Sequence, residues 1–123
     1  MKDKKESRPS WLYNQAAVLA LREQNGVTEI LLITTIKKKR WIVPKGVIDP
    51  GKTAEEAASN EAYEEAGVRG RIVSDVLGTY QYRKWGGICT VHVFLFEIDE
   101  TLEEWPESGQ RSRRWVPVEK ALN

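Results

Sequence analysis

Apolar residues gather in short runs that are rich in β-branched and aromatic side chains and are separated by turn-forming residues. Runs of this length and composition predict strands. The predicted strands cover residues 16–21, 29–35, 41–43, 73–82, 88–98 and 114–116. Asn25-Gly26 marks a turn between the first two strands, in a loop that we expect to be longer than two residues. Gly86-Gly87 joins the two long later strands.

A helical pattern covers residues 53–66. Thr53 and Glu56 have the spacing of a capping box, and Gly67 suits the residue that follows a helix. Alanines recur at helical spacing and form a small-residue face that can approach a sheet closely, at positions Ala54, Ala57, Ala58, Ala62 and Ala66. Residues 117–122 predict a terminal helix, whereas residues 45–52, with two glycines and a proline, predict a loop.

Strands before and after one central helix predict an α/β (α+β) fold, with a mixed sheet and helices on its faces. The chain has 123 residues, of which 41% are hydrophobic and 30% are charged. This length and composition indicate one soluble globular domain, at residues 11–123, after a flexible, solvated tail at residues 1–10. No apolar run is long enough to span a membrane.

The charge balance gives little indication of a macromolecular partner. The formal net charge is +1, which does not require nucleic acid or an acidic membrane as a partner.

The N-terminal residues lack the apolar stretch of a secretory signal, and Cys89, the one cysteine, has no internal disulfide partner. These features predict a cytoplasmic protein.

Three glutamates of the predicted helix, Glu61, Glu64 and Glu65, project from one face because they are three and four residues apart. They lie in the C-terminal half of the helix, where the helix dipole disfavours each carboxylate by roughly 0.3–1 kcal/mol. A divalent cation would neutralise them, since Mg²⁺ and Mn²⁺ prefer oxygen ligands. The three glutamates alone also fit an ordinary solvated acidic face, so the surrounding sequence has to decide between the two interpretations.

The stretch from Gly46 to Val68, GVIDPGKTAEEAASNEAYEEAGV, resembles the Nudix box, a loop-helix-loop signature with glutamates and glycines at fixed spacing. The chain matches it without insertion at Gly46, Glu61, Glu64, Glu65, Gly67 and Val68. The resemblance implies the Nudix fold, a mixed sheet between helices (α/β/α). Lys52 and Asn60 depart from the signature, which has glutamate and arginine there. A binding module that senses a phosphorylated ligand without cleaving it therefore stays an alternative.

The resemblance also implies a metal-dependent hydrolase. Glu61, Glu64 and Glu65 would hold Mg²⁺ or Mn²⁺ together with the main-chain carbonyl of Lys45, and Glu61, or else Glu64, would act as the catalytic base. Nudix enzymes often use a further acidic side chain from outside the box. Glu97 and Glu100 are the candidates for that role.

Basic residues next to the box are candidates for binding an anionic substrate. We expect the substrate-binding residues to be Lys39, Arg40, Lys45 and Gly46. Arg83 and Lys84 are second-line candidates. His92 and the aromatic residues Tyr80, Tyr82 and Trp85 are interpreted as packing residues.

Residues 40–46, RWIVPKG, are similar to the corresponding stretch of diphosphoinositol polyphosphate phosphohydrolases and diadenosine polyphosphate hydrolases. Residues 102–105 and 113–116 are similar to the inositol branch. The resemblance thus predicts hydrolysis of a phosphoanhydride bond in a small phosphorylated metabolite of one of these types. Removal of pyrophosphate from RNA 5′ ends is an alternative, although no extended basic and aromatic surface suited to single-stranded RNA is evident.

Overall fold

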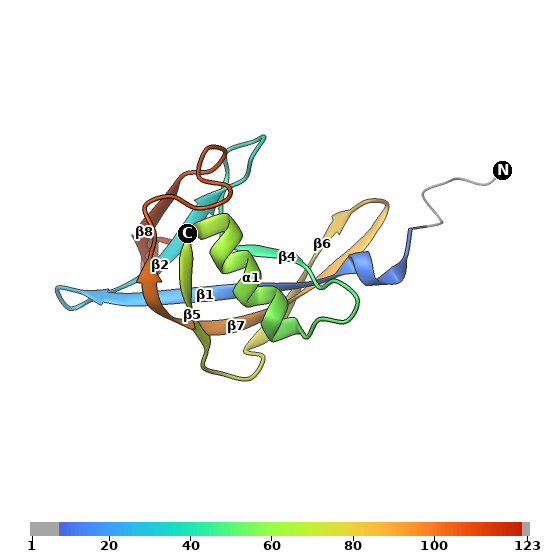
Figure 1. The fold of residues 1–123 in the computed structure, drawn as a ribbon, viewed down its shortest axis with the longest axis horizontal. Helices are drawn as coiled ribbons and strands as arrows, with labels where there is room; N and C mark the ends of the chain where they lie inside the picture. The colour runs from blue at the N-terminus through green and yellow to red at the C-terminus, as the bar shows by residue number, and fades with distance from the viewer. Residues whose placement is uncertain (1–7, 122–123) are drawn as a thin grey trace.

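The computed structural model describes residues 8–121, and Figure 1 shows one helix lying across a strongly twisted sheet. In chain order the elements are η2 (Ser10–Tyr13), β1 (Asn14–Gln24), β2 (Val27–Thr34), β3 (Trp41–Ile42), β4 (Lys45–Val47), α1 (Ala54–Ala66), β5 (Val68–Ile72), β6 (Gly78–Lys84), β7 (Gly87–Thr101), β8 (Arg113–Pro117) and α2 (Val118–Ala121).

The long strand β1 is the centre of the sheet. It pairs parallel with β7 and antiparallel with β4 through its first half, and antiparallel with β2 through its second half. β2 also pairs with β3 and β8, and β7 also pairs with β5 and β6. Parallel and antiparallel pairs therefore occur in one sheet, which confirms the predicted mixed α+β fold.

Each of the two β-hairpins has a two-residue turn between its strands. Gln24 pairs with Val27, so Asn25 and Gly26 alone form the first turn, with φ of 54° and 79°. The prediction of a longer loop was wrong because both strands continue up to the turn, where asparagine and glycine readily adopt positive φ. The second turn is Trp85-Gly86, at φ of 55° and 75°.

Two parts of the sheet differ from the sequence prediction. Residues 73–82 do not form one strand, because β5 ends at Ile72 and β6 begins at Gly78. β5 was not predicted, since its sequence VRGRI is mostly polar and contains Gly70. Gly70 lies at a bulge, where a Cβ atom would stand 1.8 Å from the Glu97 carbonyl oxygen. The predicted loop at residues 45–52 begins with β4, which pairs with β1.

α1 has both predicted end signals. The Thr53 side chain accepts a hydrogen bond from the Glu56 amide, the Glu56 side chain accepts one from the Thr53 amide, and Gly67 adopts a left-handed φ of 68°. The alanine face is buried against the sheet, as predicted, beside large side chains such as Phe94. The buried cluster that contains it consists of Ala16, Val18, Ala20, Leu31, Ile33, Ala57, Ala58, Ala62, Ala66, Val68, Phe94 and Phe96. Small side chains thus bring the acidic helix close to β1, β4 and β5.

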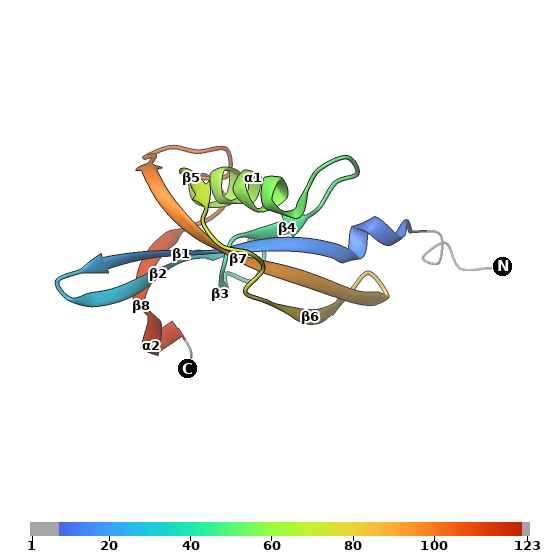
Figure 2. The same cartoon turned by 90° about the horizontal axis from the view of Figure 1, so that it is seen from below.

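Figure 2 shows α1 over one face of the sheet and α2 below the other. The described part of α2, Val118–Ala121, falls within the predicted helix 117–122, of which residue 122 lies outside the described residues. Most of the predicted tail, residues 1–7, also lies outside them, and η2 begins at Ser10. Neither helix in residues 8–121 has the length and apolar character that a bilayer span requires.

Candidate functional site

The carboxyl group of Glu61 lies directly against the main chain of Gly46. A Cβ atom at Gly46 would stand 2.3 Å from Glu61 Cδ and 2.4 Å from its Oε2, which is closer than any side chain allows. α1 supplies the glutamate, and β4 supplies the glycine. The first glycine of the box therefore has a steric role, because its missing side chain leaves space for this carboxyl group.

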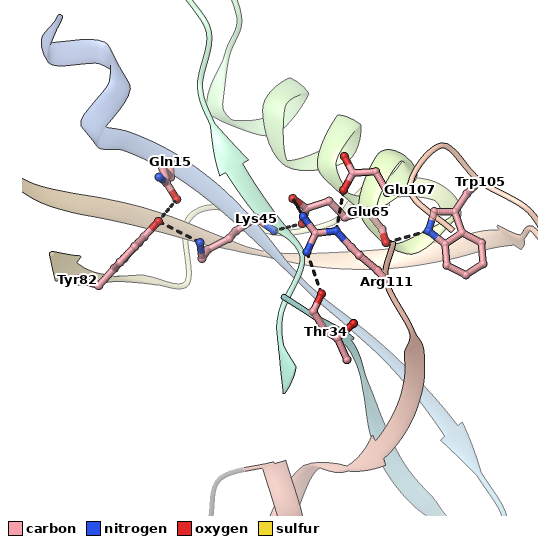
Figure 3. A network of polar contacts seen from close by, with 8 residues as sticks. All are labelled: Gln15, Thr34, Lys45, Glu65, Tyr82, Trp105, Glu107 and Arg111. Carbon is pink, nitrogen blue, oxygen red and sulfur yellow. Dashed lines mark hydrogen bonds and ion pairs between the residues drawn. The ribbon is translucent and has the colours of Figure 1, made fainter. Parts of the chain in front are cut away.

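Glu65 is 8% exposed and has partners on both carboxylate oxygens. Its Oε1 accepts a hydrogen bond of 3.0 Å from the Lys45 amide, and its Oε2 accepts one of 3.2 Å from Arg111 Nη2 (Figure 3). The first bond joins α1 to β4, and the second joins α1 to the loop before β8. The orientation of this carboxylate is thus fixed from two sides.

Glu61 and Glu65 form a pair of carboxyl groups with raised pKa values. Burial, followed by repulsion from Glu65 and then Glu64, raises the pKa of Glu61 from 4.5 to about 8. Burial also raises the pKa of Glu65, against the opposing effects of Arg111 and the Lys45 amide. The hydrogen bond between the two carboxyls favours the proton on Glu61 and the charge on Glu65. A cation that binds beside this pair would displace the proton into solvent.

Glu64 lies on the same helix face but is exposed to solvent. Its charge contributes to the raised pKa of Glu61. Its main-chain oxygen accepts a hydrogen bond of 3.1 Å from the Glu107 amide. The sequence-predicted trio is therefore present as a buried pair with a third, exposed carboxylate beside it.

The segment between β7 and β8 covers the C-terminal end of α1. Trp105 Nε1 donates a hydrogen bond of 3.0 Å to the Glu65 carbonyl, and Arg113 Nη1 donates to the Ala66 carbonyl at 2.7 Å. The Arg113 guanidinium also lies over the Trp105 ring, 4.1 Å from its centroid. Two donors, one of them a cation, thereby stabilise the negative end of the helix dipole, at the end where the glutamates stand.

A cleft of about 400 Å³ opens beside the carboxylates. It is lined by residues from four strands, α1 and the intervening loops: Gln15, Thr35, Ile36, Lys37, Ile42, Lys45, Gly46, Val47, Glu65, Tyr82, Lys84, Trp85 and Arg111. Lys45 Nζ donates a hydrogen bond of 3.0 Å to the Tyr82 hydroxyl and lies 4.6 Å from the centre of its ring. The Tyr82 hydroxyl donates to Gln15 Oε1 at 2.9 Å. One wall of the cleft therefore carries an ammonium group in a fixed position.

Some of the other predicted site residues line this cleft and some do not. Lys45 and Gly46 line it, whereas Lys39 and Arg40 are not among its lining residues. Lys39 Nζ donates to the Gln110 carbonyl at 3.1 Å. Of the second-line basic residues, Lys84 lines the cleft. Tyr82 and Trp85, interpreted as packing residues, also line it, while His92 is half-buried in β7.

The two acidic residues that were candidates from outside the box form ion pairs with arginines. Glu97 pairs with Arg71, and Glu100 pairs with Arg69, between β5 and β7. Glu107 is the acidic residue beyond α1 whose charge raises the pKa of both Glu61 and Glu65.

Sequence reasoning also missed Arg111, which bonds to Glu65 and to Glu107. Both Glu107 and Arg111 stand in an irregular polar loop, where no periodic pattern indicates which side chains point inwards.

Oxygen atoms dominate the cluster around Glu61, which fits a hard divalent cation such as Mg²⁺. Within residues 8–121, no set of three or more Asp, Glu, His or Cys side chains is arranged to enclose an ion by itself. Mg²⁺ usually takes one or two protein carboxylates and keeps several waters or substrate phosphates as further ligands. The residues present, a desolvated carboxyl pair with an exposed carboxylate beside it, fit this open kind of site.

Known proteins of one family match nearly the whole chain. A family model of the NUDIX domain matches residues 13–123. Nudix hydrolase 13, mitochondrial, of Arabidopsis thaliana is 38% identical over 104 residues, which cover 76% of this chain and 52% of that protein. Diphosphoinositol polyphosphate phosphohydrolase 3-alpha of Mus musculus is 34% identical over 117 residues, which cover 93% of this chain and 70% of that protein. The chain spans about half the length of the Arabidopsis relatives that it matches.

Solved structures agree with this match. A crystal structure of a C. elegans Ap4A hydrolase binary complex superimposes with a TM-score of 0.76 at 26% identity, over 89% of this chain and 83% of that one. A NUDIX hydrolase from Nitrosomonas europaea, at 19% identity and a TM-score of 0.70, shares the fold over 89% of this chain and 75% of that one. The family model and the sequence relatives confirm the resemblance that the Gly46–Val68 stretch indicated. The chain belongs to the Nudix family.

Proposed function

We propose that this protein is a divalent-metal-dependent hydrolase that cleaves a phosphoanhydride bond in a nucleoside-diphosphate-linked or polyphosphorylated small molecule. The observation that carries the proposal is the Glu61–Glu65 carboxyl pair, held against Gly46 beside a cleft with basic walls. Two carboxylates in contact at a partly buried position are unfavourable unless a cation or a proton compensates their negative charge. The family membership supports the same chemistry.

Glu61, Glu64 and Glu65 would hold Mg²⁺ or Mn²⁺, and the Lys45 carbonyl would be a main-chain ligand. A bound divalent ion supplies charge neutralisation for phosphate oxygens and lowers the pKa of a coordinated water. Glu65 is held in place by the Lys45 amide and by Arg111, so its carboxylate needs no reorganisation to act as a ligand. Preorganisation of this kind is what an efficient electrostatic site requires.

Glu61 is our first choice as the base that takes the proton of the attacking water, and Glu64 is the second. A base works best when its pKa lies near the working pH, and burial gives Glu61 a pKa of about 8 before any metal binds. The neighbouring main chain of Gly46 restricts where the Glu61 carboxyl can go. Glu64 is exposed, so its position is less restricted than that of Glu61.

The cleft carries cations suited to a chain of phosphates. Lys37, Lys45 and Lys84 line it beside Arg111, whose charge is paired with Glu65 and Glu107, so a polyanionic substrate would meet three further ammonium groups. Gly46 lines the cleft next to Lys45, while Lys39 and Arg40 stand in the same basic stretch, outside the cleft lining. The relatives named for diphosphoinositol polyphosphate and Ap4A support a substrate of the diphosphoinositol polyphosphate or diadenosine polyphosphate type.

The test is a panel of phosphoanhydrides offered to the full chain with Mg²⁺ and with Mn²⁺. The panel contains diadenosine polyphosphates, diphosphoinositol polyphosphates, ADP-ribose, nucleoside triphosphates and 5′-triphosphorylated RNA, with release of phosphate or nucleotide as the readout. We expect metal-dependent turnover of the first or second class. Preferential turnover of the RNA would instead assign the alternative RNA 5′-pyrophosphohydrolase activity.

A ligand-binding module without catalysis is the remaining alternative, favoured by Lys52 and Asn60, which replace two charged residues of the box signature. Such a module would show a rise in melting temperature with a panel member and no product. We also propose a cytoplasmic location, supported by the single, buried Cys89. Fractionation of cells that carry a tagged chain would test it, and recovery of the tag in an organelle would contradict it.

A further inference from the structure

The Arg111 side chain joins three oxygens that come from different parts of the fold. Its Nη2 donates to Glu65 Oε2 at 3.2 Å, its Nε to Glu107 Oε1 at 2.7 Å, and its Nη1 to the Thr34 carbonyl at 2.9 Å (Figure 3). The side chain is only 10% exposed. Two carboxylates and a carbonyl are also the kind of ligand set that a hard divalent cation takes. The guanidinium thus supplies positive charge to oxygens of the kind that also attract a divalent cation.

The loop that carries Arg111 is fixed on both sides, so this contact is built into the fold. On one side the Glu107 amide donates to the Glu64 carbonyl of α1 at 3.1 Å. On the other, the Ser112 amide donates to Thr34 Oγ1 at 2.9 Å, and the Thr34 amide donates to the Ser112 carbonyl at 3.0 Å. The Arg111 amide also donates to the Glu107 carbonyl at 3.1 Å. The guanidinium is therefore held at the carboxylates by the main chain on either side of it.

Removal of the guanidinium would leave Glu65 and Glu107 without their shared counter-charge. Both carboxylates are at least partly buried, with 10% and 29% of their side chains exposed, so solvent screens their repulsion incompletely. A lysine at this position would supply the charge but could not donate in three fixed directions from one planar group. A divalent cation would supply the missing charge by binding the freed carboxylate oxygens directly.

We propose that Arg111 is a resident cation of the acidic cluster, which neutralises Glu65 and Glu107 and thereby limits the number of divalent ions that the cluster binds. The inference rests on the proposed metal site, because it concerns the same carboxylates. Arg111 acts in this role as a positioning residue, through Glu65 and Glu107.

The test is a Mn²⁺ titration of the full chain without substrate, with free Mn²⁺ followed by electron paramagnetic resonance. We expect Arg111→Met to bind a further Mn²⁺ ion beyond the number bound by the native chain. Arg111→Met combined with Glu107→Gln should return to the native number, since one of the freed carboxylates is then gone. Arg111→Lys should keep the native number, because the positive charge remains.

Equal numbers of Mn²⁺ ions in the native chain and in a folded Arg111→Met variant would overturn this inference alone, whatever the turnover of the native enzyme. Absence of Mn²⁺ binding to the native chain would overturn both this inference and the proposed metal site. Should Arg111→Met fail to fold, the native chain provides a second measurement, the NMR signal of the Arg111 Nε–H group during a Mg²⁺ titration. We expect that signal to stay protected from exchange with water. Loss of protection in step with Mg²⁺ binding would show displacement of Arg111 by the metal and would overturn the inference.

Discussion

Gly46 and Glu61 are in such close contact that the glutamate can occupy its position only because the glycine has no side chain. The residues are far apart along the chain, on β4 and α1, yet the Glu61 carboxyl is within 2.3 Å of where a Gly46 Cβ would lie. Gly46 does not have a positive φ, so its requirement is steric. The glycine and the glutamate of the box thus form one structural unit.

Gly46→Ala is therefore expected to damage the site far more than the fold. The clashing group is the end of a flexible side chain, so Glu61 moves away and the free energy of unfolding changes by less than about 1 kcal/mol. Divalent-metal affinity is expected to fall about tenfold or more, equivalent to roughly 1.4 kcal/mol. Gly78→Ala is the matched control, since Gly78 is also a strand glycine and an added Cβ there meets nothing within 4 Å. Equal metal affinity in both variants would contradict the steric role.

The stability of the metal-free protein is expected to fall as pH rises. The pKa of Glu61 is raised from 4.5 to about 8 in the folded protein, so the folded state binds more protons than the unfolded state in this range. The stabilisation is fully present below about pH 4.5 and is lost as pH rises through about 8. The raised pKa of Glu65 acts in the same direction. Bound Mg²⁺ should weaken the trend, because it favours the ionised carboxyls.

Melting temperatures in EDTA between about pH 5 and pH 9 measure this trend. Each kcal/mol corresponds to roughly 3–8 °C for a domain of this size. Glu61→Gln cannot lose a proton, so its melting temperature should depend less on pH. A native melting temperature that rises or stays level over this range would refute the shared-proton description of the pair.

Tyr82 is expected to contribute to substrate binding by fixing the Lys45 ammonium group. Removal of its hydroxyl in Tyr82→Phe deletes the 3.0 Å hydrogen bond from Lys45 and the 2.9 Å bond to Gln15. A hydrogen bond contributes about 1 kcal/mol, so KM should rise roughly three- to tenfold with little change in kcat. Tyr80→Phe, an exposed tyrosine of the same strand outside the cleft lining, is the control. An unchanged KM in Tyr82→Phe would exclude this role.

Lys52 and Asn60, the two departures from the box signature, line one shallow surface pocket together with Arg71. The double variant Lys52→Glu with Asn60→Arg should create an exposed ion pair at these two positions. A double-mutant cycle measured by chemical denaturation should give a coupling of about 0.2–1 kcal/mol, the range of exposed pairs. A coupling of zero, or repulsion between the new arginine and Arg71, would show that the two positions are not partners in this chain.

The sequence predicts those parts of the site whose residues lie at a fixed spacing within one helix or within the box motif. Glu61, Glu64 and Glu65 share a helix face because of helical periodicity, and Thr53, Glu56 and Gly67 fix the ends of that helix. Gly46 was placed by its distance from Glu61 in the box. These positions depend on one helix and one loop, so a single stretch of sequence contains the necessary information.

Contacts between distant segments were not predictable in the same way. Arg111 reaches Glu65 across 46 positions, and Tyr82 reaches Gln15 across 67. The Tyr82 contact follows from the register of β1 against β7 and of β7 against β6, which no single stretch specifies. The Arg111 contact follows from the docking of the loop before β8 against α1 and β2. The polar strand β5 was missed for a related reason, since its pairing with β7 outweighs its weak strand propensity.

The most direct test of the central claim compares two exposed glutamates of α1, Glu64 near its C-terminal end and Glu55 in its first turn. Hydrolysis of the preferred polyphosphorylated substrate is measured with Mg²⁺ and with EDTA, for the native chain, Glu64→Gln and Glu55→Gln. We predict that EDTA abolishes turnover, that Glu64→Gln lowers it by about a hundredfold or more, and that Glu55→Gln leaves it near the native rate. Turnover that persists in EDTA, or that Glu64→Gln and Glu55→Gln leave equally intact, would contradict a metal-dependent hydrolase built on the carboxylates of this helix.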